Sequence, residues 1–535
     1  MLTPEERSRI EPFVTNLDSS VFGFQNLPSV ISGALFGRYS RSELGARELL
    51  AREFLGEGQE FRDALTGELN VGGIRIDPAK AEGFFSRVLD QYGDDSVAEL
   101  GGTAIAVENI SNVLAKIIED RRIGLSPLEK STRYVRFDRK DAAGEYPYVV
   151  DPDIDRAGHT ETYRTAMNAL FDTYTALIDP LMEELKIRFP KKDNQSDGAY
   201  RGALRGQACD VVRYLLPMST KTNVGLVGNG RAFEYLMYHL RACGLAEGAR
   251  IAKEIDDTLG FLIPAFVRRA KTDRGQGNVD YLASLFQKQK CLISQLVSDT
   301  IKEREHEATV RLIDFDRDGE QKIAAALCYD HSDMPYAQTK EFFAAHPEKV
   351  AEMIADILIP RKHRTHKPPR AFEHTQYLFE ITCDIGAFRD LHRHRMLTQQ
   401  RQGYTTLRGY AIPQDIKNAG KEGEYARAMD TAASAYETIK RDLPLQAQYC
   451  VPFGFLIRFI FRMNAREAYH LCELRSTIQG HPSYRYVAQE MAREIAKVHP
   501  NLGKGMMITW DGYDELARVA SEMRQEQKAR SRAGL

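Results

Sequence analysis

The amino-acid sequence repeats one order of landmarks in its two halves, and this repeat constrains the fold more than any other feature. In the first half the segment VRYLLP ends at Pro217, and the tripeptide NGR begins twelve residues later. In the second half AQYCVP ends at Pro452, and NAR again begins twelve residues later. A repeat of this length predicts that one structural unit occurs twice in tandem. We therefore expect two similar domains, at residues 1–275 and 276–535.

A glutamate and an arginine-rich stretch recur ahead of these landmarks. Glu99 precedes Arg121 by 22 residues, and Glu373 precedes Arg393 by 20 residues. The stretch that begins at Arg121 reads RRIGLSPLEKSTRY, whereas the stretch that begins at Arg393 reads RHRMLTQQRQGYTT. Both are rich in arginine, but they keep different polar residues. The two stretches therefore read as diverged copies of one site element.

The composition is that of an ordinary globular protein and argues against several classes. With 535 residues the chain is long enough for two or three domains. Its net charge of −2 gives no overall signature of nucleic-acid binding, and no apolar run is long enough to span a membrane. The seven cysteines form no CxxC pair, which argues against a disulfide framework and against a structural zinc site. We expect a cytoplasmic protein with no metal and with neither a membrane nor a nucleic acid as partner.

Hydrophobic periodicity predicts a chain dominated by helices. Apolar residues at three- and four-residue steps predict helices within residues 161–189, 231–263, 465–475 and 484–498. Runs of β-branched and aromatic residues predict strands at residues 103–109, 308–316 and 376–384. Polar composition predicts loops at residues 142–159 and 191–202 and a linker at residues 271–280. The expected fold class is α/β or α+β, with a mixed sheet and long packed helices.

The triplet Arg393-His394-Arg395 presents three hydrogen-bond donors of different character. Guanidinium groups bind phosphate or paired carbonyl groups through two parallel bonds, and imidazole can donate to a ring nitrogen or oxygen. Such a cluster suits an anionic planar ligand, such as a nucleotide or a flavin. The alternative is a solvated basic face that pairs with carboxylates such as Asp390.

The hexapeptide EKSTRY at residues 129–134 carries a second polar set. In an extended backbone Ser131 and Arg133 point to the same side and can grip one phosphate, while Glu129 can accept from a base or a ribose. The alternative is a turn with an ordinary capping serine. Arg213 lies inside the apolar segment VVRYLLP, where a guanidinium needs an anionic partner from the protein or from a ligand.

Four further polar residues also have ordinary structural explanations. Arg241 and Arg475 end helical stretches, where the helix dipole favours arginine. Asn464 and Arg466 can form a helix start, with the asparagine as the cap. For these residues the structural and functional interpretations both stay open.

The second half resembles the flavin-dependent thymidylate synthases, which methylate dUMP with FAD, a methylene folate and a nicotinamide reductant. The signature of that family is an R-H-R triplet followed by a serine, with G-H-x-S-x-x-E-H upstream and N-A-R and a further arginine downstream. The second half carries matching residues at His366, Glu373, His374, Arg393, His394, Arg395, Asn464, Arg466 and Arg475. It departs from the pattern at Gly403, Thr405 and Gln448, where the family has serine, arginine and arginine.

The first half resembles the same family at the complementary positions. Matching residues are Gly93, Ser96, Glu99, Ser126, Glu129, Ser131, Arg133, Tyr134 and Arg213. Arg213 lies four residues before Pro217, as the nucleotide-binding arginine of the family does, and Arg241 matches the closing arginine one residue late. The departures are the reduced triplet Arg121-Arg122-Ile123, and Asp94 and Leu100 in place of two histidines.

The resemblance implies an FAD-dependent methyltransferase that converts dUMP to dTMP, with methylene tetrahydrofolate as carbon donor and NADPH as reductant. It implies nucleotide binding by Glu129, Ser131, Arg133, Arg213 and Arg241, of which Arg213 and Arg241 would also be catalytic. It implies FAD binding by His366, Glu373, His374, Arg393, His394, Arg395, Asn464, Arg466 and Arg475. Two alternatives stay open: a diverged flavoprotein that acts on another pyrimidine nucleotide, and a non-catalytic nucleotide-binding paralogue.

The complementary losses imply that sites are shared between the domains. In the family the sites lie at the subunit interfaces of a homotetramer. A chain with two copies can build the same assembly as a homodimer that acts as a pseudo-tetramer. In that arrangement residues 393–395 of one domain would meet residues 129–134 of another.

Overall fold

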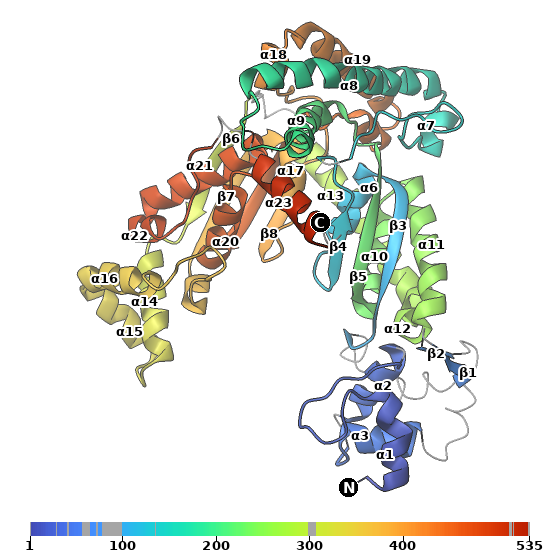
Figure 1. The fold of residues 1–535 in the computed structure, drawn as a ribbon, viewed down its shortest axis with the longest axis vertical. Helices are drawn as coiled ribbons and strands as arrows, with labels where there is room; N and C mark the ends of the chain where they lie inside the picture. Colours follow the sequence, from blue (N-terminus) through green and yellow to red (C-terminus); the bar gives the residue numbers. More distant parts are fainter. Residues whose placement is uncertain are drawn as a thin grey trace. The chain divides into compact units, whose positions relative to one another are not determined.

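The computed structural model of the chain forms two compact units that do not coincide with the two halves of the sequence (Figure 1). The first unit contains Met1–Lys130 and Lys221–Ile301, and the second contains Ser131–Thr220 and Lys302–Leu535. The structure describes residues 2–27, 29–39, 42–55, 65–70, 73–76, 99–133, 135–297, 307–512, 516 and 518–532. A segment of the first half, residues 131–220, therefore belongs to the same unit as the second half.

The first unit is built on a three-stranded antiparallel sheet with the strand order β3-β5-β4. Its strands are β3 (Gly102–Ser111), β4 (Leu125–Glu129) and β5 (Lys221–Asn229), and β1 (Leu65–Asn70) and β2 (Gly73–Ile76) form a separate hairpin. Its main helices are α6 (Asn112–Glu119), α10 (Gly230–Ala242), α11 (Ala246–Leu262) and α13 (Asp273–Val297). Smaller helices are α1 (Pro4–Ile10), α2 (Ser29–Tyr39), α3 (Ala46–Leu49) and α12 (Pro264–Val267). Apolar side chains such as Val224 and Leu236 join the sheet to α10 and α11 in one core.

The second unit is built on a four-stranded antiparallel sheet with the strand order β6-β7-β9-β8. Its strands are β6 (Thr309–Phe315), β7 (Gln376–Asp384), β8 (Leu397–Arg401) and β9 (Leu456–Asn464). Helices from the second half are α14 (Gly319–Asp330), α15 (Tyr336–Ala345), α16 (Pro347–Leu358), α17 (Ile385–Leu391), α18 (Gln414–Asn418), α19 (Glu422–Lys440), α20 (Ala465–Arg475), α21 (Pro482–Val498), α22 (Pro500–Lys504) and α23 (Val519–Arg532). Helices from the first half are α7 (Pro152–Arg156), α8 (Thr160–Arg188) and α9 (Asp197–Val212), and α8 runs beside α19 (Figure 1).

The same strand-to-helix step occurs in both sheets, and a polar residue caps each helix. Ser111 ends β3 and caps α6, while Asp384 ends β7 and caps α17. Asn229 ends β5 and accepts from the Ala232 amide at 2.8 Å, while Asn464 ends β9 and accepts from the Glu467 amide at 2.9 Å. These oxygens satisfy amides that have no partner within the helix. The equivalent positions confirm the internal repeat at the level of local structure.

The two repeats also meet at equivalent residues within the second unit. Pro217 and Pro452, the landmark prolines, form an antiparallel bridge. Two flanking backbone hydrogen bonds of 2.9 Å run from the Met218 amide to the Val451 carbonyl and from the Phe453 amide to the Leu216 carbonyl. Each bond is the counterpart of the other in the repeat. Such a self-complementary contact is what a two-fold axis between two copies produces.

The sequence-based predictions of secondary structure are mostly confirmed. The predicted helices and strands all occur, although the residues 231–263 form two helices, with Gly244 at φ +77° between them. The predicted linker at residues 271–280 is wrong, because α13 runs through it. The predicted loops contain α7 and the start of α9, which follow Asp151 and Ser196 as capping residues. The boundary at residue 275 between the two repeats stays a prediction, because the compact units are defined by contacts between residues and not by the extent of each repeat.

The fold is of the α+β class, with long packed helices as expected. Among the described residues every strand pair is antiparallel, so neither sheet is mixed in strand direction. No helix in the described part of the chain has the length and apolar character needed to cross a membrane.

Candidate functional site

A buried arginine from the first half lies at the centre of the second unit. Arg213 follows α9 at the point where the helix tightens, and it is 1% exposed. Its Nη1 lies 3.4 Å from Oδ2 of Asp390 on α17, which confirms the expected anionic partner. Its Nε and Nη2 have no hydrogen-bond partner among the described residues. Buried donors without a partner are costly, so they are well suited to receive an anionic ligand.

Asp390 is the point at which charges from both halves converge. Burial alone would raise its pKa, but the positive charges of Arg213, Arg393, Arg133 and Arg475 hold that pKa well below its usual range. Two of these arginines come from the first half and two from the second half. The charges of Arg133 and Arg393, one from each arginine-rich stretch, thus both act on Asp390 within one compact unit, while direct contact between residues 129–134 and 393–395 stays a prediction. The alternative of a solvated basic face that pairs with carboxylates such as Asp390 stays open, because Arg393 and Arg395 are exposed and the charge of Arg393 acts on Asp390.

Arg133 is held by the protein itself. Its Nε and Nη2 donate to the two carboxylate oxygens of Asp210 at 2.9 Å each, and its Nη1 donates to the Tyr484 hydroxyl at 3.0 Å. The backbone around it is a turn and not the extended segment that one interpretation required. The Val135 amide donates to the Ser131 carbonyl, and the Arg133 amide donates to the Ser131 hydroxyl, both at 3.2 Å. Ser131 therefore has the capping role of the structural alternative.

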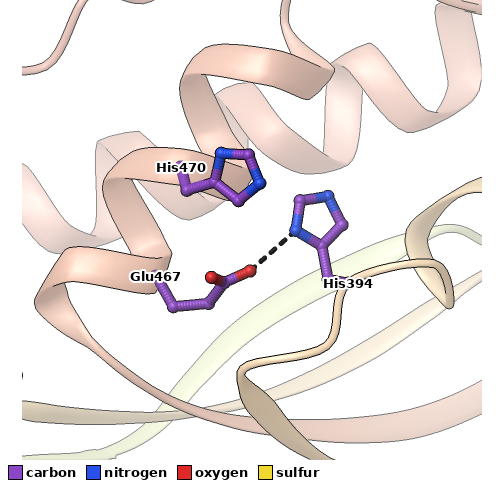
Figure 2. Close-up of side chains that lie close together, drawn as sticks. All are labelled: His394, Glu467 and His470. Atoms are coloured by element: carbon purple, nitrogen blue, oxygen red, sulfur yellow. Dashed lines mark hydrogen bonds and ion pairs between the residues drawn. The ribbon is translucent and has the colours of Figure 1, made fainter. Parts of the chain in front are cut away.

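The histidine of the triplet is hydrogen-bonded to Glu467 (Figure 2), and Arg475 contacts its other ring nitrogen. Nδ1 of His394 is 2.7 Å from Oε1 of Glu467, and Nε of Arg475 is 3.1 Å from Nε2 of His394. A guanidinium can only donate, so Nε2 must accept and the ring proton must lie on Nδ1. Burial and the nearby charges of Arg475 and Lys367 lower the pKa of His394 well below its usual value. His394 is therefore neutral, and it links a buried carboxylate to Arg475.

His470 completes a group that has the composition of a metal site. One ligand atom from each of His394, Glu467 and His470 lies within 4.8 Å of the others, and two of the side chains project from α20 toward the third (Figure 2). Both nitrogens of the His394 ring are already used, by Glu467 and Arg475, and Lys367 bonds to Nδ1 of His470. Two cationic side chains against the group disfavour a further cation. The sequence-based expectation of no metal stays a prediction.

The NAR arginine is tied to the upstream glutamate in both repeats. Nη1 of Arg466 lies 3.1 Å from Glu373, and its Nε donates to the Pro368 carbonyl at 2.8 Å. In the first unit Arg231 and Glu99, at the equivalent positions, form an ion pair of 2.8 Å. The pair therefore belongs to the repeated structure and persists in the copy whose triplet is reduced.

The remaining residues predicted for the flavin side differ in exposure. Arg393, Arg395, His366 and His374 are exposed, and the His374 ring packs against Tyr336. Asn464 caps α20, as its structural interpretation predicted. Arg475 ends α20, and its guanidinium lies over the Tyr484 ring at 5.6 Å.

Two residues predicted for the nucleotide belong to the first unit. Glu129 is buried there and pairs with Nζ of Lys116 at 2.8 Å. Arg241 bonds to Asp256 at 3.0 Å and to the Ala270 carbonyl at 2.9 Å. Both side chains are thus engaged in internal contacts. Tyr134, Gly93, Asp94 and Ser96 lie outside the described residues.

The first unit contains a cavity of about 640 Å³ that the sequence did not predict. Its lining includes four arginines, Arg121, Arg231, Arg269 and Arg274, together with Tyr235 and Tyr238. It lies beside the reduced triplet and the first turn of α10. The repeated Arg231–Glu99 pair forms part of the wall of this cavity.

The sequence interpretation missed the residues that hold the arginines of the second unit. They are Asp210, Arg389, Tyr484 and Arg518, of which Arg389 donates to Thr132 at 3.0 Å. Asp210 offered one signal, because a carboxylate three residues before Arg213 in an apolar helix is unusual. The partners of Asp210 are far away in sequence, so local patterns could not identify them.

Comparison with known proteins gives one family and three kinds of relative. The family model described as thymidylate synthase complementing protein matches residues 57–264 and 311–501. A UPF0159 protein of Chlamydia muridarum is 41% identical over 98% of both chains, and one of Thermoplasma acidophilum is 35% identical over 93% of this chain and 99% of the relative. A flavin-dependent thymidylate synthase of Sulfolobus acidocaldarius is 25% identical over 36% of this chain and 75% of the relative.

Among solved structures, a UMP/dUMP methylase from Streptomyces cacaoi, bound with 5-Br dUMP, is similar to part of the chain. The match has 19% identity and a TM-score of 0.29, and it covers 38% of this chain and 96% of the methylase.

Proposed function

The chain belongs to the thymidylate synthase complementing protein family, and from this premise we propose that it is a flavin-dependent enzyme that reductively methylates dUMP to dTMP. Methylene tetrahydrofolate would supply the carbon and NADPH the reducing equivalents. A homodimer of two-repeat chains would take the place of four single-domain subunits. The flavin-dependent relatives support the chemistry, and the second unit supports the binding of the nucleotide.

One observation carries the proposal: the arginines of both repeats converge on the buried Asp390. Arg133 also pairs with Asp210, but the charges of Arg213, Arg393 and Arg475 act together on Asp390 and exceed its single negative charge. Arg213 adds two buried donors that no described side chain satisfies. A phosphate accepts several charge-assisted hydrogen bonds at once and is the anion that best matches such a set. Arg213 would hold the phosphate, and Arg475, fixed by His394, would face the nucleotide from the second repeat.

The residues of the second repeat fit a phosphate-bearing cofactor at the exposed side of the same unit. Arg393 and Arg395 are exposed, and Arg466 has 36% of its side chain exposed beside Glu373. These donors would bind the FAD phosphates, and His366, His374 and Asn464 would contribute polar contacts. FAD, when bound, supplies the hydride and methylene transfer for which the chain has no side chain of its own. His394 cannot donate through Nε2 in the tautomer that Arg475 imposes.

A specific observation also favours a second candidate, a flavoprotein that acts on another pyrimidine nucleotide. Asp210 and Tyr484 occupy three of the Arg133 donor groups, and Gly403, Thr405 and Gln448 replace the polar residues of the family signature. Because the available hydrogen-bond donors differ from those of the family, a different ligand would be the one that satisfies every buried polar group.

The test combines the flavin content with activity on nucleotides. The purified full-length protein should show flavin absorbance at about one flavin per chain and should support growth of a thymidine auxotroph. The variant R213A should lose complementation, whereas R164A, at an exposed pair with Glu145, should retain it. Bound flavin without complementation, together with turnover of a different pyrimidine nucleotide, would establish the second candidate. A colourless protein that still binds a nucleotide would indicate a non-catalytic role.

A further inference from the structure

The C-terminal helix packs on a glycine stripe and lies beyond the residues that match the family. The match ends at residue 501, and α23 spans Val519–Arg532. On α9, glycines recur every four residues at Gly198, Gly202 and Gly206. The side chains nearest to them come from α23 and the residue before it, and they are Glu526, Glu522 and Arg518, respectively. The two helices therefore run antiparallel and in register, side by side in the second unit (Figure 1).

The glycines allow contacts that a larger residue would disturb to different degrees. A Cβ atom at Gly206 would lie 2.6 Å from Nη1 and 3.3 Å from Cδ of Arg518, so an alanine there must displace the arginine head. A Cβ atom at Gly202 would lie 3.4 Å from the nearest Glu522 atom, which is an ordinary contact. The stripe thus contains one position that controls Arg518 and one that does not.

Arg518 holds Arg133 from two sides. Its Nη1 donates to the backbone carbonyl of Arg133 at 3.0 Å. Its Nη2 forms an ion pair with Oδ2 of Asp210, the same oxygen that accepts from Nη2 of Arg133 at 2.9 Å. One side chain therefore fixes the turn that carries Arg133 and the carboxylate that orients its guanidinium. Arg518 is 5% exposed, so these bonds are shielded from water.

Arg518 also decides the charge of this group. Asp210 is buried, and Arg133 and Arg518 together keep it ionised. Without Arg518, the pair of Arg133 and Asp210 would be neutral. With Arg518, the group has a net charge of +1, and it lies in the unit that contains the open donors of Arg213. The group of Arg133, Asp210 and Arg518 would therefore attract an anionic ligand, whereas the neutral pair of Arg133 and Asp210 would not.

We propose that Arg518 is a positioning residue for nucleotide binding and that α23, which we call the strap, holds it in place by packing on α9. Docking of α23 on the glycine stripe places Arg518 against Asp210 and the Arg133 carbonyl, and this contact sets the geometry and the charge of the phosphate side of the site. The inference rests on the proposed function for its ligand, dUMP. The contact that it assigns, between the strap and the Arg133 turn, can be measured without a ligand.

The test compares two alanine substitutions on one helix in the full-length protein. Both G206A and G202A replace a glycine within α9, where alanine is the better helix former. G202A should therefore keep the melting temperature of the parent, whereas G206A should also lose the stability that the displaced Arg518–Asp210 contact contributes. Binding is therefore measured well below the melting temperature of each variant. Titration calorimetry with dUMP should show affinity weakened about tenfold or more in G206A and in R518A, as expected when a buried charged contact is broken. G202A should bind as the parent does. R518K should bind with intermediate affinity, because a single ammonium cannot engage the carboxylate and the carbonyl as a planar fork does.

Amide exchange separates a failure of this inference from a failure of the proposed function. The Val135 amide, bonded to the Ser131 carbonyl, reports the Arg133 turn in the absence of nucleotide. It should exchange faster in G206A and R518A than in the parent and G202A. If G206A binds dUMP as tightly as G202A does and the Val135 amide exchanges equally in both, the inference is overturned. If the parent protein binds no dUMP but the exchange rates differ as expected, the role of Arg518 in fixing the Arg133 turn is supported and dUMP is refuted as the ligand.

Discussion

Replacing Arg213 by alanine separates a ligand-binding residue from a structural one. Arg213 and Arg485 are both 1% exposed and are among the largest fully buried side chains of the chain. Arg485 is satisfied by the protein, since its three nitrogens donate to the carbonyls of Ser476, Asp511 and Gly512. Arg213 has one side-chain hydrogen bond, to Asp390 at 3.4 Å, and two of its nitrogens have no hydrogen-bond partner among the described residues. The two arginines are equally buried but differ in how many of their donors are hydrogen-bonded, so each serves as the control for the other.

The structure sets the expected magnitudes. In R485A a fully buried guanidinium is removed and three carbonyls, of which that of Ser476 is buried, lose a charged donor, so the free energy of unfolding should fall by roughly 3–5 kcal/mol. In R213A the loss of a long ion pair is offset by removal of two unsatisfied donors, each of which costs about 1–3 kcal/mol. Three other arginine charges still act on Asp390. The change in unfolding free energy of R213A should therefore stay below about 2 kcal/mol.

Nucleotide affinity should fall more in R213A than in R485A, the reverse of the order expected for stability. If Arg213 binds a phosphate, R213A should lose ~2–5 kcal/mol of binding free energy, which is about 30-fold or more in the dissociation constant. R485A, measured below its melting temperature, should bind dUMP as the parent does. Urea denaturation and titration calorimetry on the three proteins give both quantities. A loss of stability in R213A as large as that in R485A, with unchanged affinity for dUMP, would refute the reasoning.

Three further predictions concern single side chains. Burial and the charge of Arg213 lower the pKa of His481 to about 3, so below pH 6.5 the unfolded chain takes up a proton that the folded chain does not. The free energy of unfolding should then fall by ~1.4 kcal/mol per pH unit from this residue, and H481N, which retains a helix cap, should show a shallower slope in urea titrations between pH 6 and 4. R395A should retain less flavin after gel filtration than R164A does, because Arg395 is exposed on the triplet; equal flavin absorbance would contradict its role. N464D keeps the capping oxygen but removes the amide donor, so it should keep the melting temperature of the parent and lose flavin only if that amide contacts the cofactor, whereas N464A should lose about 1 kcal/mol of stability.

The sequence was informative about repeats and helices and less so about strands. Residues 465–475 and 376–384 were predicted with the bounds that the structure has, because their periodicity is clear. Strand β5, KTNVGLVGN, was missed because Gly225 and Gly228 weaken its local strand preference, and β9, LIRFIFRMN, reads equally as a buried helix. Pairing with β3 and β7 decides both, and pairing is a long-range property.

The residues of the candidate site likewise differ in whether local sequence could predict them. Arg213 could be predicted, because a guanidinium in an apolar segment requires an anion wherever the segment lies. The ion pair between Arg518 and Asp210 could not, because 308 residues separate them and no sequence motif distinguishes Arg518. The turn at Ser131 could not be distinguished from an extended segment, since both satisfy the same hexapeptide.

The compact units give the complementary losses of the two repeats a physical reason. Residues 131–220 carry Ser131, Arg133 and Arg213, and they lie in the second unit together with the intact triplet of the second repeat. That unit thus combines three of the kept residues of the first copy with the intact triplet of the second. The first unit keeps its own sheet, Glu129, Arg241, the Arg231–Glu99 pair and a reduced triplet. A substitution in the first triplet would then leave the combined set intact, and so would the loss of signature residues at 403 and 405. Selection would act on one set per chain and leave the other free to diverge, which is why about one flavin per chain, and not two, is the expected stoichiometry.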